Sequence, residues 1–355
     1  MSNIKKIQSA MKEKGIKALL LTDELDRQYA SGFHSTDGYM LILPGYACFI
    51  TDSRYIEAAQ SSVQDAAVLM SSGGNSQNEI VRRILEEHGV TELGVQEYSL
   101  SYGGYMHLEN KLGVKFVPAQ DITLSLRQTK ERYEVDSIIS AQRIAEKALD
   151  FVLGFIKDGL TEKEIAAELE YRMAKNGSEG LAFDTICVSG ENSSRPHGVP
   201  TGRKIRMGDF ITMDFGCKIN GYCSDMTRTV ALGRVTDEMK TVYDTVLKAQ
   251  LAGISAARAG IAGKLVDKAA RDVIESAGYG EYFGHGLGHS VGLFIHESPN
   301  ANTREERILP AGAVITCEPG IYLPGRFGVR IEDMLLITET GYVNLTEAPK
   351  NLIIL

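Results

Sequence analysis

Two ten-residue stretches, MGDFITMDFG at 207–216 and AGAVITCEPG at 311–320, decide the fold of this chain. They align at an offset of 104 residues, which places Asp214 on Glu318. A second match, at an offset of 101, pairs DGL at 158–160 with AGI at 259–261. Each half therefore reads as helices followed by a β-hairpin. Two such halves related by an approximate two-fold axis would bring the carboxylates of both hairpins together.

The first hairpin can be registered from its turn. The β-rich run 209–230 is interrupted by Asn220-Gly221, a dipeptide that favours a two-residue hairpin turn because both central positions need a positive φ. This turn places Ile219 opposite Tyr222.

The same register brings two acidic side chains to one face. Asp225 lies opposite Gly216, and Asp214 shares the face of Gly216 because side chains alternate with period two. The two aspartates become diagonal neighbours with Cα atoms roughly 7–8 Å apart. A cation between them would remove their repulsion. The alternative is that both simply face solvent.

The second hairpin is expected from residues 313–318 and 328–338, around LPGR at 323–326. Glu332 follows Glu318 by 14 residues, against 11 between the aspartates, and the longer loop accounts for the difference. Four converging carboxylates need about two divalent cations, since unpaired buried charge costs several kcal/mol. The sequence therefore predicts a dinuclear metal centre.

A glycine-rich stretch, FGHGLGHSVG at 283–292, supplies the imidazoles. A lone histidine is more often a core residue, but His285, His289 and His296 lie within twelve residues, and glycines allow the backbone close to a site. Oxygen-rich donors with one imidazole suit Mn²⁺, Co²⁺, Fe²⁺ or Zn²⁺. We therefore expect His289 to be the fifth ligand.

Two competing motifs fail on spacing. GHSVG at 288–292 matches the nucleophile elbow that would make Ser290 catalytic, but a downstream acid and then a histidine are required, and the last histidine is His296. The glycines of 284–288 also resemble a dinucleotide loop, yet no ribose-binding acid follows at the right distance.

Composition restricts the partners. With 38 Lys+Arg against 46 Asp+Glu, a net charge of −8 argues against nucleic acid or an anionic membrane as the main partner. No apolar run is long enough for a membrane span. The five cysteines lack C-x-x-C spacing, which favours small buried thiols in a reducing cytoplasm.

At 355 residues, two domains are expected. Residues 1–127 alternate β-rich runs (18–22, 39–43, 47–51 and 114–117) with helical stretches such as 76–88, as in a small α/β domain. A charged stretch near Arg127 precedes a long helical pattern over 133–157, so residues 128–355 form the second domain.

The ordered set Asp214, Asp225, His289, Glu318 and Glu332, with FGHGLGH and IHE around the histidine, resembles the pita-bread metallopeptidases. The resemblance covers about residues 128–350 and implies an α/β (α+β) fold of two pseudo-symmetric helix-plus-hairpin halves. The amino-terminal region, with YASGF at 29–33, resembles the creatinase-like α/β domain of aminopeptidase P and prolidase. This implies cleavage at an Xaa-Pro bond.

The resemblance also implies roles. A water or hydroxide bridging two divalent ions, Mn²⁺ being the first choice, would attack the peptide, with Glu318 as proton acceptor. His197 and His296 would steady the scissile carbonyl, and His285 would line the proline pocket. Arg330, two residues before Glu332, would hold a ligand carboxylate.

One departure bears on the substrate. Prolidases often carry arginine four residues after the histidine of IHE, and here that position is Asn300, although Arg304 or Arg307 could substitute. We therefore expect aminopeptidase P-like cleavage at the amino terminus of proline-containing peptides, with Xaa-Pro dipeptidase activity as the alternative. A metal-free creatinase-like hydrolase or binding module is a remote alternative. The resemblance further implies a homodimer.

Overall fold

The computed structural model describes residues 2–355, which divide after Arg127 into two compact units. The first unit is built on a six-stranded mixed sheet with strand order β4-β3-β2-β1-β5-β6. Its strands are β1 Leu19–Leu21, β2 Tyr39–Leu43, β3 Tyr46–Thr51, β4 Ala67–Met70, β5 Glu92–Val95 and β6 Lys115–Pro118. The four strands expected from the sequence are therefore confirmed, with ends shifted by at most one residue.

Six helices accompany this sheet: α1 Asn3–Glu13, α2 Glu24–Ser31, α3 Ile56–Ser62, α4 Gln77–Glu87, α5 Tyr102–Leu112 and α6 Gln120–Arg127. The expected helix 76–88 is α4, which begins at a capping box because Ser76 and Glu79 each accept from the other's backbone N–H. A buried ion pair, Arg127 Nη1 to Asp26 Oδ1 at 2.7 Å, joins α6 to α2.

The second unit begins with two helices and a three-stranded sheet of order β11-β8-β7. Its first half contains α7 Arg132–Phe155, α8 Glu162–Lys175, β7 Ile186–Ser189, the short 3₁₀ helix η1 Gly190–Ser194, β8 Phe210–Phe215, β9 Lys218–Ile219, β10 Tyr222–Cys223 and β11 Met226–Ala231. The long helix expected over 133–157 is therefore confirmed as α7.

The second half repeats this order around a five-stranded sheet, β13-β12-β14-β17-β18. Its elements are α9 Asp237–Ala256, α10 Gly263–Ser276, η2 Gly280–Tyr282, β12 Gly288–Ser290, β13 Glu297–Ala301, β14 Val314–Cys317, β15 Gly320–Leu323, β16 Phe327–Arg330, β17 Asp333–Ile337 and β18 Tyr342–Asn344. The helix-plus-hairpin repeat read from the sequence is present in the structure.

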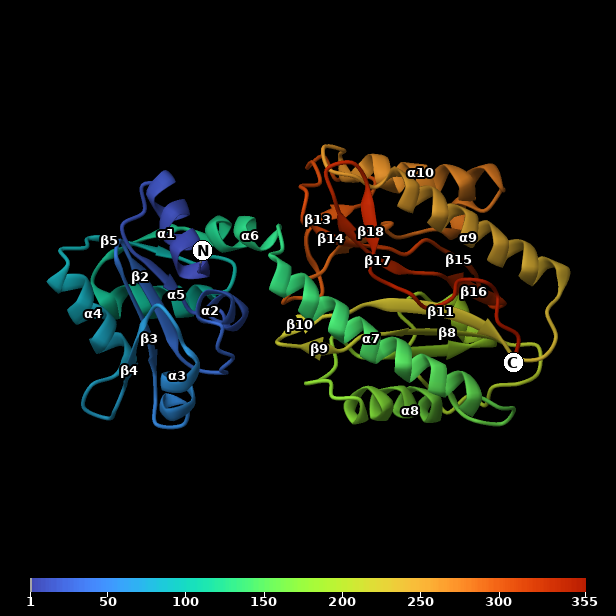
Figure 1. The fold of residues 1–355 in the computed structure, drawn as a ribbon, viewed down its shortest axis with the longest axis horizontal. Coiled ribbons are helices and arrows are strands. Elements are labelled where there is room, and N and C mark those ends of the chain that lie inside the picture. The colour runs from blue at the N-terminus through green and yellow to red at the C-terminus, as the bar shows by residue number, and fades with distance from the viewer. Residues whose placement is uncertain (1) are drawn as a thin grey trace. The chain divides into compact units, whose positions relative to one another are not determined.

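Each half buries its strands against its own helix pair. In Figure 1 the strands of this unit lie between the pair α7 and α8 and the pair α9 and α10. One apolar core joins α7 and α8 to β8 and β11, and another joins α9 and α10 to β14 and β17. The strands carry polar groups between these two cores.

The turn at Asn220-Gly221 is confirmed. Both residues have positive φ, 52° and 77°, and Ile219 pairs with Tyr222. The register continues into β8 and β11, where Asp214 pairs with Thr227.

Gly216 is required where this hairpin is interrupted between its two ladders. A Cβ atom on Gly216 would lie 1.9 Å from the carbonyl oxygen of Ser224. The backbones can approach this closely only because residue 216 has no side chain.

Among residues 2–355, no helix combines the length and apolar character that a bilayer span requires. All five cysteines are buried and free, as expected.

Candidate metal centre

Three of the expected ligands already form a compact cluster. One ligand atom each from Asp225, His289 and Glu332 lies within 4.8 Å of the other two. Asp225 lies between β10 and β11, His289 in β12, and Glu332 between β16 and β17. Asp225 and Glu332 are buried, with 4% and 1% exposure. Two carboxylates and an imidazole from different hairpins therefore face one point.

Glu318 completes one side of this cluster. His289 Nε2 lies 3.5 Å from Asp225 Oδ2 and 3.5 Å from Glu318 Oε1. The second hairpin keeps one register on both sides of Glu318, because Cys317 pairs with Asp333 and Gly320 pairs with Arg330. Glu318 and Glu332 are therefore direct counterparts across the hairpin, whereas the aspartates are diagonal neighbours.

Asp214 lies in β8 and contacts Arg330. Arg330 Nη2 lies 2.7 Å from Asp214 Oδ2, and both side chains are buried. The other oxygen, Oδ1, is buried and has no hydrogen-bond partner among residues 2–355. A buried carboxylate oxygen without a donor is costly, and a cation would satisfy it.

The acidic groups shift one another's protonation in the metal-free molecule. Burial raises the pKa of Glu318 to about 8, against the lowering effect of Arg330. Burial, followed by the charge of neighbouring carboxylates, raises the pKa values of Asp225 and Glu332 well above their usual range. Mutual repulsion of buried carboxylates is the condition that divalent cations relieve.

His289 is prepared to coordinate through Nε2. Burial lowers the pKa of His289 to about 4, so its ring is neutral near pH 7. Nδ1 lies 3.2 Å from the carbonyl oxygen of Ser290, which can only accept. Nδ1 therefore carries the proton, and the lone pair of Nε2 faces the carboxylates. The donor set of four carboxylates and one imidazole thus fits divalent first-row metals.

Arg330 connects several parts of the site. Besides Asp214, its guanidinium donates to Tyr322 Oη at 2.9 Å, to Thr227 Oγ1 at 3.0 Å and to the carbonyl of Pro196 at 3.2 Å. Thr227 in turn donates to Glu332 Oε2 at 2.7 Å. Asp214 and Glu332, two expected ligands from different halves, are therefore linked through one arginine and one threonine.

His285 uses both ring nitrogens within the protein. Nδ1 lies 2.7 Å from the Gly286 carbonyl oxygen, and Nε2 lies 2.9 Å from Tyr322 Oη. Burial lowers the pKa of His285 to about 4. The ring is therefore neutral and oriented, with Nε2 accepting from the tyrosine.

The other two histidines stand at the edge of the cluster. The ring of His296 lies 4.5 Å from that of His289, nearly perpendicular to it, and burial lowers the pKa of His296. His197 is exposed, and its segment is held where Pro196 accepts from Arg330. His197 also influences the pKa values of His285 and His296 electrostatically, which places all three in one neighbourhood.

Sequence reasoning missed Tyr322, Thr227 and Thr316. Thr227 could have been found, because the hairpin register puts it directly opposite Asp214. Thr316 Oγ1 donates to Glu318 Oε1 at 3.3 Å and accepts from the His289 N–H at 3.1 Å. Tyr322 was missed because the sequence did not fix the register of β15 and β16, in which Tyr322 lies opposite Gly328 and diagonally beside Arg330.

Ser290 and Arg307, which were considered for other roles, bond to groups outside the acidic cluster. Ser290 is buried and donates to the Pro299 carbonyl at 2.5 Å, so it is not positioned as a nucleophile. Arg307 binds Glu305, with Nε to Oε1 at 2.8 Å, while the side chain of Arg304 is exposed.

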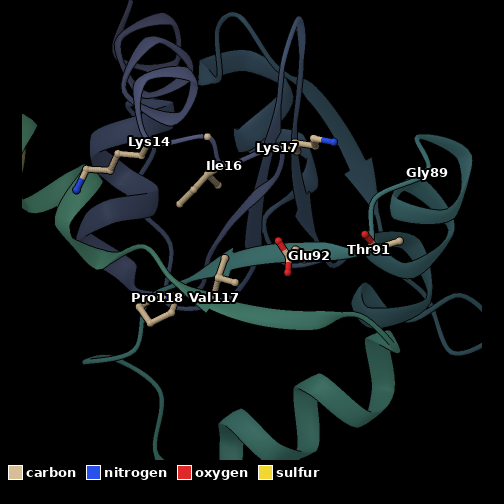
Figure 2. Close-up of a pocket in the computed structure, with 9 residues that line it drawn as sticks. Lys14, Ile16, Lys17, Gly89, Thr91, Glu92, Val117 and Pro118 are labelled. Atoms are coloured by element: carbon tan, nitrogen blue, oxygen red, sulfur yellow. The ribbon is translucent and has the colours of Figure 1, made fainter.

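A pocket in the amino-terminal unit, shown in Figure 2, contains none of these residues. Its charged lining side chains, Lys14, Lys17 and Glu92, are exposed to solvent. Glu92 pairs with Lys115 at 2.7 Å. The convergent buried chemistry lies instead in the carboxyl-terminal unit.

Comparison with known proteins gives two family matches. Residues 136–339 match the model of metallopeptidase family M24, and residues 3–129 match that of the creatinase/prolidase N-terminal domain.

Solved structures and curated sequences match over the whole chain. The structure is similar to that of the Xaa-Pro dipeptidase from Bacillus anthracis, at 40% identity and a TM-score of 0.96 over 99% of each chain. The X-Pro aminopeptidase from Thermotoga maritima matches at 37% identity and a TM-score of 0.93, covering 98% of this chain and 100% of that one. The Xaa-Pro dipeptidase of Pyrococcus horikoshii is 37% identical over 99% of this chain and 98% of the relative.

Proposed function

The chain belongs to metallopeptidase family M24, and we propose that it is a two-metal Xaa-Pro dipeptidase, which hydrolyses the bond before proline in dipeptides. The observation that carries the chemistry is the convergence of buried carboxylates on His289 Nε2, with Asp214 Oδ1 unsatisfied beside them. Membership of this family makes the chain a metal-dependent hydrolase. Specificity for dipeptides is the further part of the proposal.

The preference for dipeptides reverses the order expected from the sequence alone. Asn300 argued for an aminopeptidase P-like enzyme, yet relatives named as Xaa-Pro dipeptidases match the full chain at 37% and 40% identity. The X-Pro aminopeptidase from Thermotoga maritima, at 37% identity, keeps cleavage of longer peptides as the second candidate. Both candidates use the same centre and differ in what binds beyond proline.

The metal ligands in this proposal are Asp214, Asp225, His289, Glu318 and Glu332. Bound there, two divalent ions would polarise the scissile carbonyl and acidify the attacking water toward a pKa of roughly 7. We propose Mn²⁺ as the native ion, with Co²⁺, Zn²⁺ and Fe²⁺ as the alternatives to test.

The remaining catalytic roles are assigned to four side chains around the metal ligands. Glu318, held by the Thr316 hydroxyl, takes the proton of the attacking water. His296 and His197 donate to the scissile carbonyl oxygen as it gains negative charge. Arg330 keeps Asp214 oriented through its 2.7 Å contact.

His285 has a different part from the other histidines. Because its two nitrogens are already bonded and its ring is neutral, it presents carbon atoms to the site. We assign it to the wall of the proline pocket, where an apolar ring face suits the pyrrolidine ring.

The substrate is tested by comparing Xaa-Pro dipeptides with Xaa-Pro-Yaa tripeptides after loading with Mn²⁺ or Co²⁺. We expect chelator-sensitive cleavage with a higher kcat/KM for dipeptides. A higher value for tripeptides would replace the dipeptidase by the aminopeptidase. No chelator-sensitive cleavage of either substrate would reject both and favour the metal-free creatinase-like alternative.

We also propose that the protein works as a homodimer in the cytoplasm, with residues 1–127 and 128–355 as separate folding domains. Five buried free thiols suit a reducing compartment such as the cytoplasm.

The proposed homodimer is tested by light scattering coupled to size-exclusion chromatography, and a monomeric mass would reject it.

A further inference from the structure

The glycine-rich segment 283–289 is held by an ion pair on helix α10. Arg271 donates from Nη1 to the Phe283 carbonyl at 2.9 Å and from Nη2 to the His285 carbonyl at 2.7 Å. Asp267 Oδ1 accepts from the Leu287 N–H at 3.0 Å. The backbones of Phe283, His285 and Leu287 are therefore hydrogen-bonded to side chains of one helix, α10, which is labelled in Figure 1.

The pair itself is rigid. Arg271 contacts Asp267 through two nitrogens, Nε at 2.8 Å and Nη2 at 3.0 Å. Asp267 is 1% exposed, and the Arg271 guanidinium carbon lies 4.2 Å from the centre of the Phe283 ring. Bidentate geometry and ring stacking restrict a guanidinium far more than a single contact would.

The bonds made by this pair lead directly to metal ligands. Leu287 donates its N–H to Asp267, and its carbonyl accepts from the N–H of Glu318 at 2.7 Å. His289, two residues after Leu287, is the middle residue of β12. The position of Leu287 therefore sets the backbone at Glu318 and at His289, although Asp267 and Arg271 are not among the ligand atoms.

The first half of the repeat has no ion pair at the corresponding positions. At the offset of 101 residues that aligns the two halves, Ala166 stands in place of Asp267 and Glu170 in place of Arg271. Between its helices and its hairpin that half carries a single histidine, His197, whereas the second half carries His285, His289 and His296. The Asp267–Arg271 pair thus accompanies the segment that carries His285 and His289.

We infer that Asp267 and Arg271 are positioning residues, which hold segment 283–289 so that His285 and His289 take their places in the site. Glycines give the segment its close approach but leave its backbone flexible. The ion pair replaces the missing strand partners at residues 283, 285 and 287. Its role in hydrolysis rests on the proposed function, whereas its role in metal binding does not.

The decisive variant is Arg271→Met, which keeps most of the aliphatic stem and removes every hydrogen bond of the guanidinium. We expect faster amide hydrogen exchange over 283–289, and an Mn²⁺ affinity about 10- to 100-fold weaker by calorimetry, as for other partners of metal ligands. In the assay, kcat should fall by more than KM rises. Arg271→Lys should recover part of each effect.

Helix α10 offers a matched control. Lys268 and Asp272 form an ion pair of the same spacing, at 2.6 Å, but both side chains are exposed. Lys268→Met should leave hydrogen exchange, Mn²⁺ affinity and kcat at wild-type values. If Arg271→Met fails to fold, Asp267→Asn provides the test, because its amide oxygen can still accept from Leu287 while the ionic contact is lost.

The outcomes separate the two proposals. An Arg271→Met protein with a lower Tm but wild-type Mn²⁺ affinity, exchange and kcat would show a merely structural pair and overturn the inference. If the wild-type protein cleaves no peptide, the proposed function fails, and the exchange and Mn²⁺ measurements still decide whether the pair positions the segment.

Discussion

Replacing Thr227 by valine removes one hydroxyl from the centre of the site with little change of side-chain shape. This hydroxyl donates to Glu332 Oε2 at 2.7 Å and accepts from Arg330 Nε at 3.0 Å. Thr227 is fully buried, at 0% exposure, so solvent cannot replace either bond. The substitution therefore breaks the link between Asp214 and Glu332, the proposed ligand carboxylates of the two halves.

The magnitude follows from those two bonds. Losing a hydrogen bond to a charged group costs about 1.5–3 kcal/mol, and leaving the Arg330 Nε–H without an acceptor costs about 1–3 kcal/mol. The two losses share one hydroxyl and are not additive, so we expect the free energy of unfolding of the metal-free protein to fall by about 2–4 kcal/mol. The Mn²⁺ affinity should weaken about 10- to 100-fold, because Glu332 is no longer oriented.

Urea unfolding followed by far-UV circular dichroism measures the first effect, since the chain has no tryptophan to report by fluorescence. Calorimetric titration with Mn²⁺ measures the second. Thr227→Ser keeps the hydroxyl and should retain the wild-type Mn²⁺ affinity.

Thr229 in the same strand provides the control. It is buried and donates to the Arg330 carbonyl at 3.0 Å, but it bonds no ligand carboxylate. Thr229→Val should lower the free energy of unfolding and leave the Mn²⁺ affinity unchanged. The reasoning is refuted if Thr227→Val binds Mn²⁺ as tightly as the wild type.

Three further results are expected. Asp214→Asn should lower kcat by more than about 100-fold, because losing a ligand exceeds the cost of losing its partner; an unchanged kcat in steady-state assays rejects the ligand role. In the metal-free protein, the raised pKa of Glu318, about 8, means that this carboxyl binds more protons in the folded state than in the unfolded state. The effect is clearest between about pH 7.5 and 8, above the ordinary pKa of histidine, where His285, His289 and His296 are largely neutral in both states. The free energy of unfolding should therefore fall with rising pH across that window, by up to about 1.4 kcal/mol per pH unit, and Mn²⁺ should abolish the fall; a flat profile in urea titrations without metal contradicts the shift. Lys130→Met leaves the carboxylate of Glu297 buried without its 3.0 Å ionic partner, so the free energy of unfolding should drop by about 3–5 kcal/mol, and a loss below 1 kcal/mol by urea titration would show that the carboxylate is relieved in another way.

The amino-acid sequence determined much of the local geometry. Asn220-Gly221 specified the turn and the register, because few residues accept positive φ at both central positions. The alternation of side chains then placed Asp214 and Asp225 on one face, and the repeat placed Glu318 and Glu332 in the second hairpin. The sequence pattern also predicted helices α4 and α7.

Only the tertiary structure decided how these pieces act on one another. The contacts of Arg330 with Asp214 and of Thr227 with Glu332 each join residues more than 100 positions apart, and no local preference encodes them. Tyr322 and His285, which are 37 positions apart, likewise meet only in the folded chain, and their contact orients the imidazole ring. Backbone conformation at a turn depends on the residues of the turn itself. The orientation of a buried carboxylate depends instead on which distant side chains the two cores bring into contact with it.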